Sequence, residues 1–478
     1  MDKKALRKEY FELRDKIPTD KRIKKSQKIF EILKANEAYQ KANIIFIYAS
    51  FHSEVYTHEF IKLALEDKKN ICLPVVISDQ EMEVFKIHSM DQLKKDNFGI
   101  LSPDPNSCSK VLPEEIDLAL IPLLAFNAQG YRLGYGKGYY DRYLPQLKAT
   151  CNKIGIAFSE QFSKELPVSI YDYPLDHILT ENGFSFITER IETHSHCSEF
   201  SPDSERSFED FLLEANKKNY SYLTLTDHFD KDVIDGHVIR SDKDDLYTPR
   251  ENEWIMPLSS YIDFCVQKKK ELENKPDSTQ LLIGIELGYQ DYLLESFKQI
   301  VNQYPFDCVI GSIHTMFKYD FAVFSEPLYG LGKEKAYQAY LETILELAQS
   351  DLDFDILAHF DYVTRYAPYD DPYFYYQDYP ELFDQIFMTI IKKEIALEVN
   401  TRTRYRGLLS GKKDWGIADL NIYQRYYDLG GRMISFATDA HQSGNLHLLI
   451  SDSIQQIKKI GFTKGTYFIN RKPKFYDL

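Results

Sequence analysis

The sequence predicts an α/β protein with two domains, an open α/β sheet domain followed by a parallel β/α barrel. The chain has 478 residues, which exceeds the size of one ordinary hydrophobic core. In its first half, short apolar runs alternate with helical stretches. In its second half, apolar runs repeatedly end in His, Asp or Glu, as expected where strand ends meet at the mouth of a barrel. We expect the two domains to span residues 1–188 and 189–478.

The elements of the first domain follow from its apolar pattern. Residues 3–35 have helical periodicity and are rich in Lys and Arg, and a second helical stretch covers residues 59–67. Apolar runs of strand length occur at residues 44–48, 71–76, 118–123 and 183–187. Strands that alternate with helices are typical of an open α/β sheet with helices on its faces.

The second domain repeats a β–α unit. Its predicted strands cover residues 222–226, 281–285, 308–313, 354–358, 395–397 and 433–438. Amphipathic stretches occur between the strands at residues 208–218, 335–348, 379–393 and 422–429. This repeat predicts a parallel barrel, and in such barrels the C-terminal ends of the strands carry the functional residues.

The composition narrows the class of protein. With 44% hydrophobic and 27% charged residues, the chain is globular. A net charge of −15 argues against a nucleic-acid-binding protein, because that affinity comes from Lys and Arg contacts to phosphates. No apolar run reaches transmembrane length, no signal region opens the chain, and the six cysteines are scattered. We therefore expect a cytoplasmic protein that acts on small molecules, without nucleic-acid or membrane partners.

Metal-type side chains follow the predicted strands of the second domain. The set is His194, His196, Asp227, His228, Glu286, His314, His359, Glu398, Asp439 and His441, which includes six of the chain's twelve histidines. A single histidine after an apolar run is more often a hydrogen-bonded core residue, but a series at successive strand ends is not expected by chance. Neutral imidazole and carboxylate bind zinc, manganese or iron. The pattern therefore predicts a polynuclear metal centre and metal-assisted hydrolysis.

A glycine-rich segment is the most informative part of the first domain. It reads Gly130-Tyr131-Arg132-Leu133-Gly134-Tyr135-Gly136-Lys137-Gly138-Tyr139-Tyr140-Asp141-Arg142. Its glycines let the backbone approach a ligand and turn N–H groups toward anionic oxygens. Arg132 and Lys137 are suited to phosphate, and Asp141 is suited to Mg²⁺. A surface loop without a ligand is the alternative, and the Walker A pattern is not present.

The whole segment resembles the signature of the 5-formyltetrahydrofolate cyclo-ligases, and the resemblance covers residues 1–187. Lys3-Lys4-Ala5-Leu6-Arg7 is similar to the ATP-contacting segment of that family, and Glu54-Val55-Tyr56-Thr57 is similar to its folate-contacting turn. The resemblance implies ATP binding by Lys3, Lys4, Arg7, Arg132, Gly134, Gly136, Lys137, Gly138, Tyr139 and Tyr140. It also implies folate binding by Glu54, Tyr135 and Tyr139, and Mg²⁺ binding by Asp141 and Asp172. The implied reaction converts ATP and 5-formyltetrahydrofolate to 5,10-methenyltetrahydrofolate. A folate- or nucleotide-binding module without turnover is the alternative.

The second domain resembles the PHP (polymerase and histidinol phosphatase) superfamily over residues 190–478. The motifs are His-x-His, Thr-Asp-His, Glu-Leu-Gly, Ser-Ile-His, Ala-His-Phe-Asp, Glu-Val-Asn-Thr and Thr-Asp-Ala-His, in the order found in the histidinol-phosphatases. The resemblance implies a distorted (β/α)7 barrel with two or three metal ions. One ion would take His194, His196, Glu286 and Asp439, a second Glu286, His314 and His359, and a third His228 and His441. Phe200-Ser201-Pro202-Asp203 stands where some relatives carry another histidine, so the third position is the least defined.

The same resemblance implies hydrolysis of a phosphate monoester, with L-histidinol phosphate as the expected substrate. Arg365 matches a phosphate-binding arginine, and a second is expected after Asn400-Thr401, where Arg402, Arg404 and Arg406 all occur. Asp227 or Asp361 would orient an imidazole or protonate the leaving alcohol. The alternatives are a phosphoesterase for another substrate, such as a nucleotide or phosphotyrosine, a metal-sensing module, and a scaffold without turnover.

Overall fold

Parallel β-strands form the centre of both parts of the chain in the computed structural model. The structure describes residues 2–478 except 96–98, 149, 186–188, 231–232, 235–236, 239–255, 276–277, 318, 324, 412–415 and 418. The chain divides into two compact units, Met1–Thr188 and Glu189–Leu478. Among the described residues, the helices include none that is both long and apolar enough to cross a membrane.

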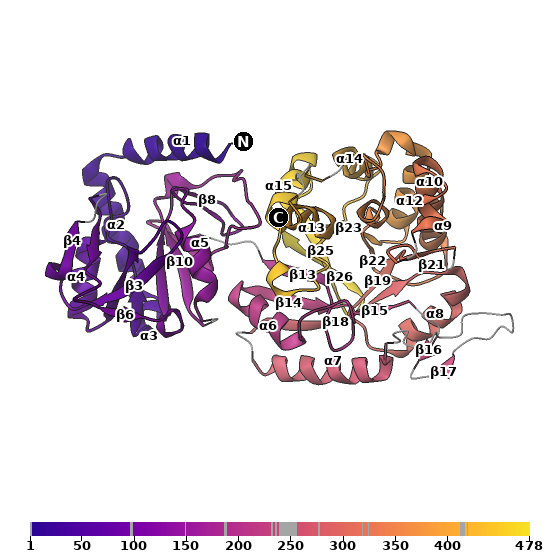
Figure 1. The fold of residues 1–478 in the computed structure, drawn as a ribbon, viewed down its shortest axis with the longest axis horizontal. Helices are drawn as coiled ribbons and strands as arrows, with labels where there is room; N and C mark the ends of the chain where they lie inside the picture. Colours follow the sequence, from indigo (N-terminus) through magenta and orange to yellow (C-terminus); the bar gives the residue numbers. More distant parts are fainter. Residues whose placement is uncertain are drawn as a thin grey trace. The chain divides into compact units, whose positions relative to one another are not determined.

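The first unit contains an eight-stranded sheet (Figure 1). In spatial order its strands are β12 (Gly183–Ser185), β11 (His177–Thr180), β10 (Asn152–Ile156), β7 (Leu118–Pro122), β1 (Ile44–Phe46), β2 (Asn70–Val76), β3 (Met82–Ile87) and β6 (Ser109–Val111). The strands from β11 to β2 pair in parallel, and the sheet continues with antiparallel strands at both edges. The predicted open α/β sheet is confirmed; residues 186–187 of the predicted last strand lie outside the described residues.

Two hydrophobic clusters cover the two faces of this sheet. Neighbouring residues of β1 alternate between them, because Ile45 belongs to one cluster and Phe46 to the other. The helices are α1 (Lys3–Asp15), α2 (Thr19–Ala35), α3 (Glu37–Lys41), α4 (His58–Glu66) and α5 (Tyr139–Tyr143). The helical periodicity predicted over residues 3–35 corresponds to two helices, because the chain turns at Pro18. Proline there cannot donate a backbone hydrogen bond to a continuing helix.

The strand order of the first unit fixes where its loops meet. Among the five parallel strands, β1 pairs on one side with β2 and on the other with β7, so the order in which the chain adds strands to the sheet reverses between β1 and β7. Loops at the C-terminal ends of two such strands diverge and leave a crevice, which is the usual ligand position in open α/β sheets. Here the two loops carry Glu54 and the glycine-rich segment.

The second unit is a nearly closed barrel of seven parallel strands, which confirms the predicted architecture. The strands follow each other in chain order: β13 (Arg190–Ser195), β14 (Tyr220–Leu225), β18 (Gln280–Gly288), β19 (Cys308–Ser312), β22 (Ile356–Leu357), β23 (Ala396–Asn400) and β24 (Ile434–Ala437). The short strand β15 (His228–Phe229) extends β14 and pairs with β18. The first and last strands meet just past their ends, where His196 N donates to Ala440 O at 3.1 Å.

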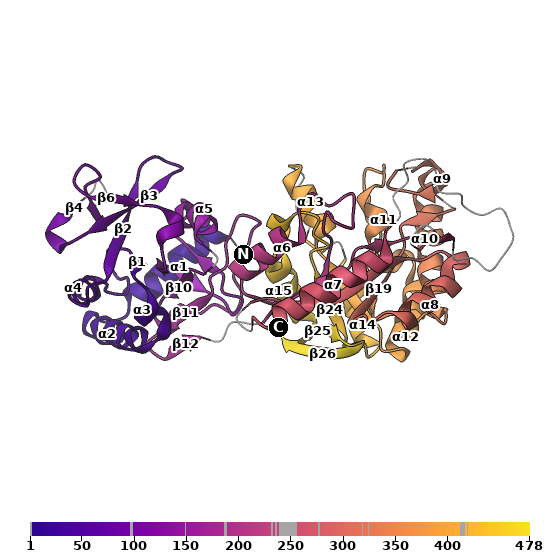
Figure 2. The same cartoon turned by 90° about the horizontal axis from the view of Figure 1, so that it is seen from below.

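Helices surround this barrel. They are α6 (Phe208–Lys217), α7 (Leu258–Glu273), α8 (Leu294–Gln303), α9 (Glu326–Tyr329), α10 (Lys333–Gln349), α11 (Tyr362–Arg365), α12 (Pro380–Lys392), α13 (Arg402–Leu409), α14 (Leu420–Asp428) and α15 (Ile450–Ile460). Figure 2 shows the long helix α7 along the outside of the unit, where it packs on β18. Most buried side chains of strands and helices form one large hydrophobic core, and a smaller separate cluster consists of Cys308, Ile310, Ile356, Ala358, Ala396 and Phe468.

A β-hairpin contacts the N-terminal ends of two barrel strands. It consists of β25 (Lys464–Ile469) and β26 (Lys472–Asp477), joined by a turn at Asn470 and Arg471. Arg471 Nε donates to Asp355, just before β22, at 2.5 Å, and Asn470 N donates to Asp307, just before β19, at 3.0 Å. The hairpin therefore anchors the end of the barrel opposite to the predicted metal-type residues.

Candidate metal centre and nucleotide site

The metal-type residues of the second unit converge at the C-terminal ends of the barrel strands. Almost all are buried, with side chains of His194, His196 and Glu286 at 0% exposure. Three groups of residues have ligand atoms within 4.8 Å of one another: His194, His196 and Glu286; His228, Glu286 and His314; and His196, His228 and His441. The groups share members, so they form one continuous centre.

Glu286 lies in the middle of this centre. Its Oε2 lies 3.3 Å from His194 Nε2, 3.6 Å from His196 Nε2 and 2.7 Å from His228 Nδ1. Its Oε1 lies 3.2 Å from His314 Nε2 and 2.9 Å from His359 Nε2. Five imidazoles therefore surround one carboxylate, with different rings on its two oxygens. That arrangement suits a carboxylate that bridges two cations.

Several of these atoms are buried without a hydrogen-bond partner among the described residues. They include Nε2 of His194, both ring nitrogens of His196, Nδ1 of His228 and Oε2 of Glu286. Buried polar atoms normally have partners, and leaving one without a partner costs about 1–3 kcal/mol. The ring nitrogens of His194, His196 and His228 that are nearest to Glu286 Oε2 lie 2.7–3.6 Å from it without hydrogen-bond geometry. The donor set fits divalent metal ions that accept lone pairs from imidazole and carboxylate.

The electrostatics of the centre favour positive charge. Burial opposes charge on His194, but Glu286, Glu398 and Asp439 outweigh it and raise its pKa well above the usual range. In the same way, burial disfavours charge on His314, yet Glu286 and Asp230 raise its pKa to about 10. Burial and the neighbouring rings of His228 and His441 instead lower the pKa of His196. The carboxylates thus attract cations into a largely buried site.

Asp203 joins this centre, although it follows no predicted strand. Its Oδ2 lies 2.7 Å from His441 Nε2 and 3.8 Å from His228 Nε2. The Asp203 side chain is 52% exposed, and although partial desolvation opposes the shift, these two imidazoles lower its pKa. Sequence reasoning did not assign Asp203, and the only signal was an acidic residue in the loop after the His-x-His pair. The structure thus adds a carboxylate to the group that the sequence defined least.

Two of the predicted acids, Glu398 and Asp227, support residues of the centre through hydrogen bonds. Glu398 accepts from His359 N at 2.7 Å, and its other oxygen lies 2.9 Å from His194 Nδ1. Asp227 accepts from Cys197 N at 3.0 Å and from Ser201 Oγ at 2.5 Å, and it is fully buried. Burial raises its pKa to about 7, with the Ser201 and Cys197 bonds opposing that rise. Asp227 therefore holds the loop after His196, and the same loop carries Asp203.

The remaining acid and the four arginines lie around the centre in different ways. Burial raises the pKa of Asp361, against the effect of Arg365 and His359. Arg365 Nη1 donates to Asp439 Oδ2 at 3.3 Å, and its Nη2 is buried without a partner in the described chain. Arg402 Nη1 lies 2.8 Å from Asp439 Oδ1 and 2.8 Å from His441 Nε2.

Arg404 and Arg406 make other contacts. Arg404 donates to Asp452 at 2.8 Å and to Ser453 at 3.1 Å, both on α15. Arg406 donates to the Tyr366 hydroxyl at 3.0 Å and lies over its ring. Of the three arginines after Thr401, the one that contacts the metal-type residues is Arg402.

The glycine-rich segment of the first unit follows β7 and leads into α5. Gly136 and Gly138 have φ values of 104° and 70°, which favour glycine. Helix α1 lies against the segment, because Arg7 Nε donates to Gly134 O at 2.9 Å and Lys3 pairs with Asp172. Lys4 and Lys137 are exposed.

The other predicted residues of the segment have internal partners. Arg132 is buried and donates to Tyr173 O and to Asp141 Oδ1, both at 2.8 Å. Tyr139 donates to Ser78 O at 3.2 Å, and Tyr140 stacks on Phe46. Arg132 therefore fixes Asp141 at the start of α5, and both residues stabilise the conformation of the loop.

Glu54 and Tyr135 meet between the two loops. The Tyr135 hydroxyl donates to Glu54 and accepts from Arg14 Nη1 at 2.8 Å, while Phe51 N donates to Glu54 at 2.8 Å. Burial raises the pKa of Glu54, although Tyr135 and Arg14 oppose the shift. Arg14 is 2% exposed and was not predicted from the sequence. Its position on α1, seven residues after Arg7, is the signal that would have found it.

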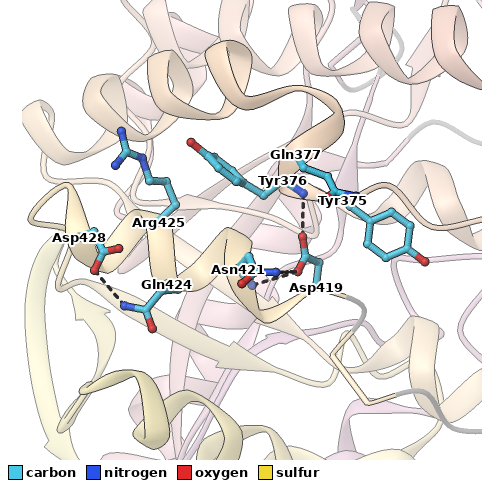
Figure 3. Close-up of a pocket in the computed structure, with 8 residues that line it drawn as sticks. All are labelled: Tyr375, Tyr376, Gln377, Asp419, Asn421, Gln424, Arg425 and Asp428. Atoms are coloured by element: carbon cyan, nitrogen blue, oxygen red, sulfur yellow. Dashed lines mark hydrogen bonds between the residues drawn. The ribbon is translucent and has the colours of Figure 1, made fainter.

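A surface pocket of about 450 Å³ lies elsewhere on the second unit (Figure 3). The sequence-predicted site residues are not among the eight residues that line it. Its polar groups satisfy one another: Asp419 accepts from Tyr376 N at 2.7 Å and from Asn421 N at 3.0 Å, as the dashed lines in Figure 3 show. The Asp419 carboxylate is therefore already engaged by neighbouring residues of the pocket wall.

Comparisons with known proteins agree with this division. The sequence model of the 5-formyltetrahydrofolate cyclo-ligase family matches residues 1–181, and that of the PHP domain matches residues 192–402. The 5-formyltetrahydrofolate cyclo-ligase of Mycoplasma pneumoniae is 36% identical over 186 residues, which are 38% of this chain and 99% of that protein. The probable histidinol-phosphatase of Clostridium acetobutylicum is 29% identical over 286 residues, which are 60% of this chain and 99% of that protein.

A solved structure also resembles the second unit. It is the crystal structure of histidinol phosphate phosphatase from Lactococcus lactis subsp. lactis complexed with zinc, L-histidinol and phosphate. That protein is 25% identical, and the match covers 60% of this chain and 99% of that chain with a TM-score of 0.49.

Proposed function

Because this chain belongs to the 5-formyltetrahydrofolate cyclo-ligase family and also carries a PHP domain, we propose that it is a bifunctional enzyme. Its first unit makes 5,10-methenyltetrahydrofolate, and its second unit hydrolyses a phosphate monoester. The proposed domains coincide with the two compact units, Met1–Thr188 and Glu189–Leu478. The six free cysteines suit the reducing environment of the cytoplasm, where we propose that the enzyme works.

The phosphatase proposal rests mainly on the buried nitrogen and oxygen atoms around Glu286 that have no hydrogen-bond partner among the described residues. His194, His196, Glu286 and Asp439 would hold one metal ion, and Glu286, His314 and His359 would hold a second. His228, His441 and Asp203 would hold a third. Bound divalent ions neutralise phosphoryl oxygens and make a water molecule more acidic.

The chain's own residues bind and orient the phosphate in this proposal. Arg365 has a buried Nη2 without a partner, and Arg402 lies on the same carboxylate, Asp439. Two guanidinium groups can donate to different oxygens of one phosphate. Burial of the surrounding side chains strengthens these contacts. Asp361 is the candidate that returns a proton to the leaving alcohol, because Asp227 is engaged with its loop.

L-histidinol phosphate is the proposed substrate, since the relatives over the second unit are histidinol-phosphatases by name. The test is phosphate release from L-histidinol phosphate, a nucleotide monophosphate and phosphotyrosine by protein with measured metal content. We expect the first to be preferred, and we expect Asp439→Ala to abolish release. Preference for another ester would change the substrate, and a metal-loaded protein that hydrolyses none of them would refute the phosphatase.

In the cyclo-ligase proposal, ATP transfers its γ-phosphoryl group to the formyl oxygen of 5-formyltetrahydrofolate. N10 then attacks the activated carbon, and phosphate leaves. The glycine-rich segment would cradle the phosphates with Arg7 and Lys137, and Asp141 and Asp172 would hold Mg²⁺. Glu54 would accept hydrogen bonds from the folate ring. The Glu54 and glycine loops at the strand-order reversal support this proposal.

The cyclo-ligase test follows the ultraviolet absorbance of methenyltetrahydrofolate. Product should form only when ATP, Mg²⁺ and 5-formyltetrahydrofolate are all present. If folded protein binds the folate but the absorbance does not rise, the first unit is a binding module without turnover.

A further inference from the structure

We propose that Asp230 is a positioning residue for His314, and that residue 288 is glycine because the Asp230 carboxylate occupies the space of a side chain there. The inference rests on the proposed metal centre and deepens it. It concerns two residues to which neither the sequence patterns nor the comparisons assign a role.

Strand register brings the three residues together. His228 of β15 is opposite Glu286 of β18, and Gly288 of β18 is opposite Ser312 of β19. Asp230 comes two residues after His228, Gly288 two after Glu286, and His314 two after Ser312. His228, Glu286 and Ile310 are in register, and one step of two residues along the three strands leads to Asp230, Gly288 and Ser312. His314 follows Ser312 by two further residues, next to Asp230 and Gly288.

Asp230 contacts the ring nitrogen of His314 that faces away from Glu286. Asp230 Oδ2 lies 3.3 Å from His314 Nδ1, whereas His314 Nε2 lies 3.2 Å from Glu286 Oε1. A carboxylate on Nδ1 keeps the proton on that nitrogen and leaves the Nε2 lone pair free for a metal ion. His194 shows the same arrangement, with Glu398 at 2.9 Å from Nδ1 and Glu286 at 3.3 Å from Nε2.

Gly288 leaves the space that the Asp230 carboxylate occupies. A Cβ atom on residue 288 would lie 2.0 Å from Asp230 Oδ1 and 2.6 Å from its Cγ. Gly288 is not among the residues with positive φ, so its backbone conformation is open to alanine. The requirement for glycine is thus steric and comes from one side chain. It accounts for the glycine of the Glu-Leu-Gly motif.

The position of Asp230 is hard to explain by packing alone. Its Oδ1 is buried without a hydrogen-bond partner among the described residues, which is unfavourable for a carboxylate. The backbone is held separately, because Gln290 Nε2 donates to Asp230 O at 3.1 Å. The loop therefore does not depend on the carboxylate for its anchor. The carboxylate faces the imidazole and the glycine.

The experiment is a double-mutant cycle of Asp230→Ala and Gly288→Ala, read out by metal binding. Zn²⁺ or Co²⁺ is titrated into full-length, metal-free protein, and the stoichiometry and affinity of each site are measured together with the Co²⁺ absorption spectrum. We expect each single variant to weaken one metal site by about 10- to 100-fold. The double variant should be no weaker than Asp230→Ala, because the alanine at 288 fits once the carboxylate is gone.

Two further variants make the result specific. Asp230→Asn keeps an oxygen that accepts from Nδ1, so it should retain most of the affinity. Asp291→Ala removes an exposed acid three residues beyond Gly288 and should change nothing. Asp230→Ala with wild-type affinity, or a Gly288→Ala loss of equal size in both backgrounds, would overturn the inference. If the wild type itself binds no metal, the proposed centre fails as well, and the two failures are thereby distinguished.

Discussion

Arg402 donates to Oδ1 of Asp439 at 2.8 Å, so a proposed phosphate-binding cation and a proposed metal ligand are in direct contact. We predict that Arg402→Ala lowers kcat/KM for the phosphate ester by about 100-fold, because a charged donor to the phosphoryl group is lost. Metal content, measured on the same samples, should stay unchanged. Arg404→Ala is the matched control, since Arg404 pairs with Asp452, and it should change kcat/KM by less than about threefold. Equal losses in both variants would contradict the assignment.

Removal of metal should destabilise the second unit selectively. Hydrogen exchange of peptides from residues 189–478, followed along a denaturant titration, reports the unfolding transition of this unit alone. Ions that bind only the folded state at 100 times their Kd add about 3 kcal/mol. We expect chelation to lower the midpoint of this transition and to abolish phosphatase activity, and Zn²⁺ or Mn²⁺ to restore both.

The cyclo-ligase activity provides the control for that experiment. Mg²⁺ alone should restore it to the chelated protein. An unfolding midpoint that does not respond to chelation would contradict a structural contribution from bound ions.

Glu54→Gln should weaken folate binding without affecting ATP. A carboxylate that accepts from a ligand N–H contributes more than an amide, and we expect KM for 5-formyltetrahydrofolate to rise by about tenfold. KM for ATP should remain within about twofold. Glu59→Gln, on the exposed side of α4, is the control. A rise in both KM values would show that Glu54 supports the whole loop and does not contact the folate.

The stability of the barrel should depend on Asp355 and pH. Burial raises the pKa of Asp355 to about 6, from an ordinary value of 3.8, although Arg471 opposes the shift. Because the folded-state pKa is the higher one, the contribution of Asp355 to stability is complete below pH 3.8 and declines as pH rises through about 6. Asp355→Asn does not titrate.

Unfolding followed by hydrogen exchange of peptides from residues 189–478 measures this effect. Between about pH 4.5 and about pH 7.5, the wild type should lose about 2 kcal/mol relative to Asp355→Asn. A difference between the two proteins that stays constant, or grows in favour of the wild type as pH rises, would contradict the predicted sign.

Much of the barrel could be predicted because its strands are buried and parallel. Such strands read as continuous apolar runs, and their ends mark where the functional side chains begin. Asp203 and Asp230 were missed because this signal stops at the strand ends. They lie in loops beyond those ends, where no periodicity indicates which side chains turn inward.

Other differences between the prediction and the structure come from side-chain contacts that a sequence pattern does not reveal. Asp227 and Glu398 share the strand-end position of the metal-type residues, but their oxygens are engaged by Ser201 and by backbone N–H groups. Spacing does not distinguish an acid that faces the centre from one that supports it. In the first unit, β3, β6, β10 and β11 were not predicted. β6 is a short, mostly exposed edge strand, and the other three are runs of four to six residues that mix polar with apolar side chains.

The pairing of the first barrel strand with the last has a consequence for protein synthesis. Thr438 contacts Glu192 across 246 positions of the chain, and the metal-type residues on either side come from both ends of that interval. A ribosome that has made the first unit has already made all of its sheet, so that unit can fold while translation continues. The metal centre, in contrast, cannot assemble before the last barrel strand has been synthesised. Until β24 emerges, a nascent chain holds only part of the donor set, and ions loaded before that point would meet an incomplete site.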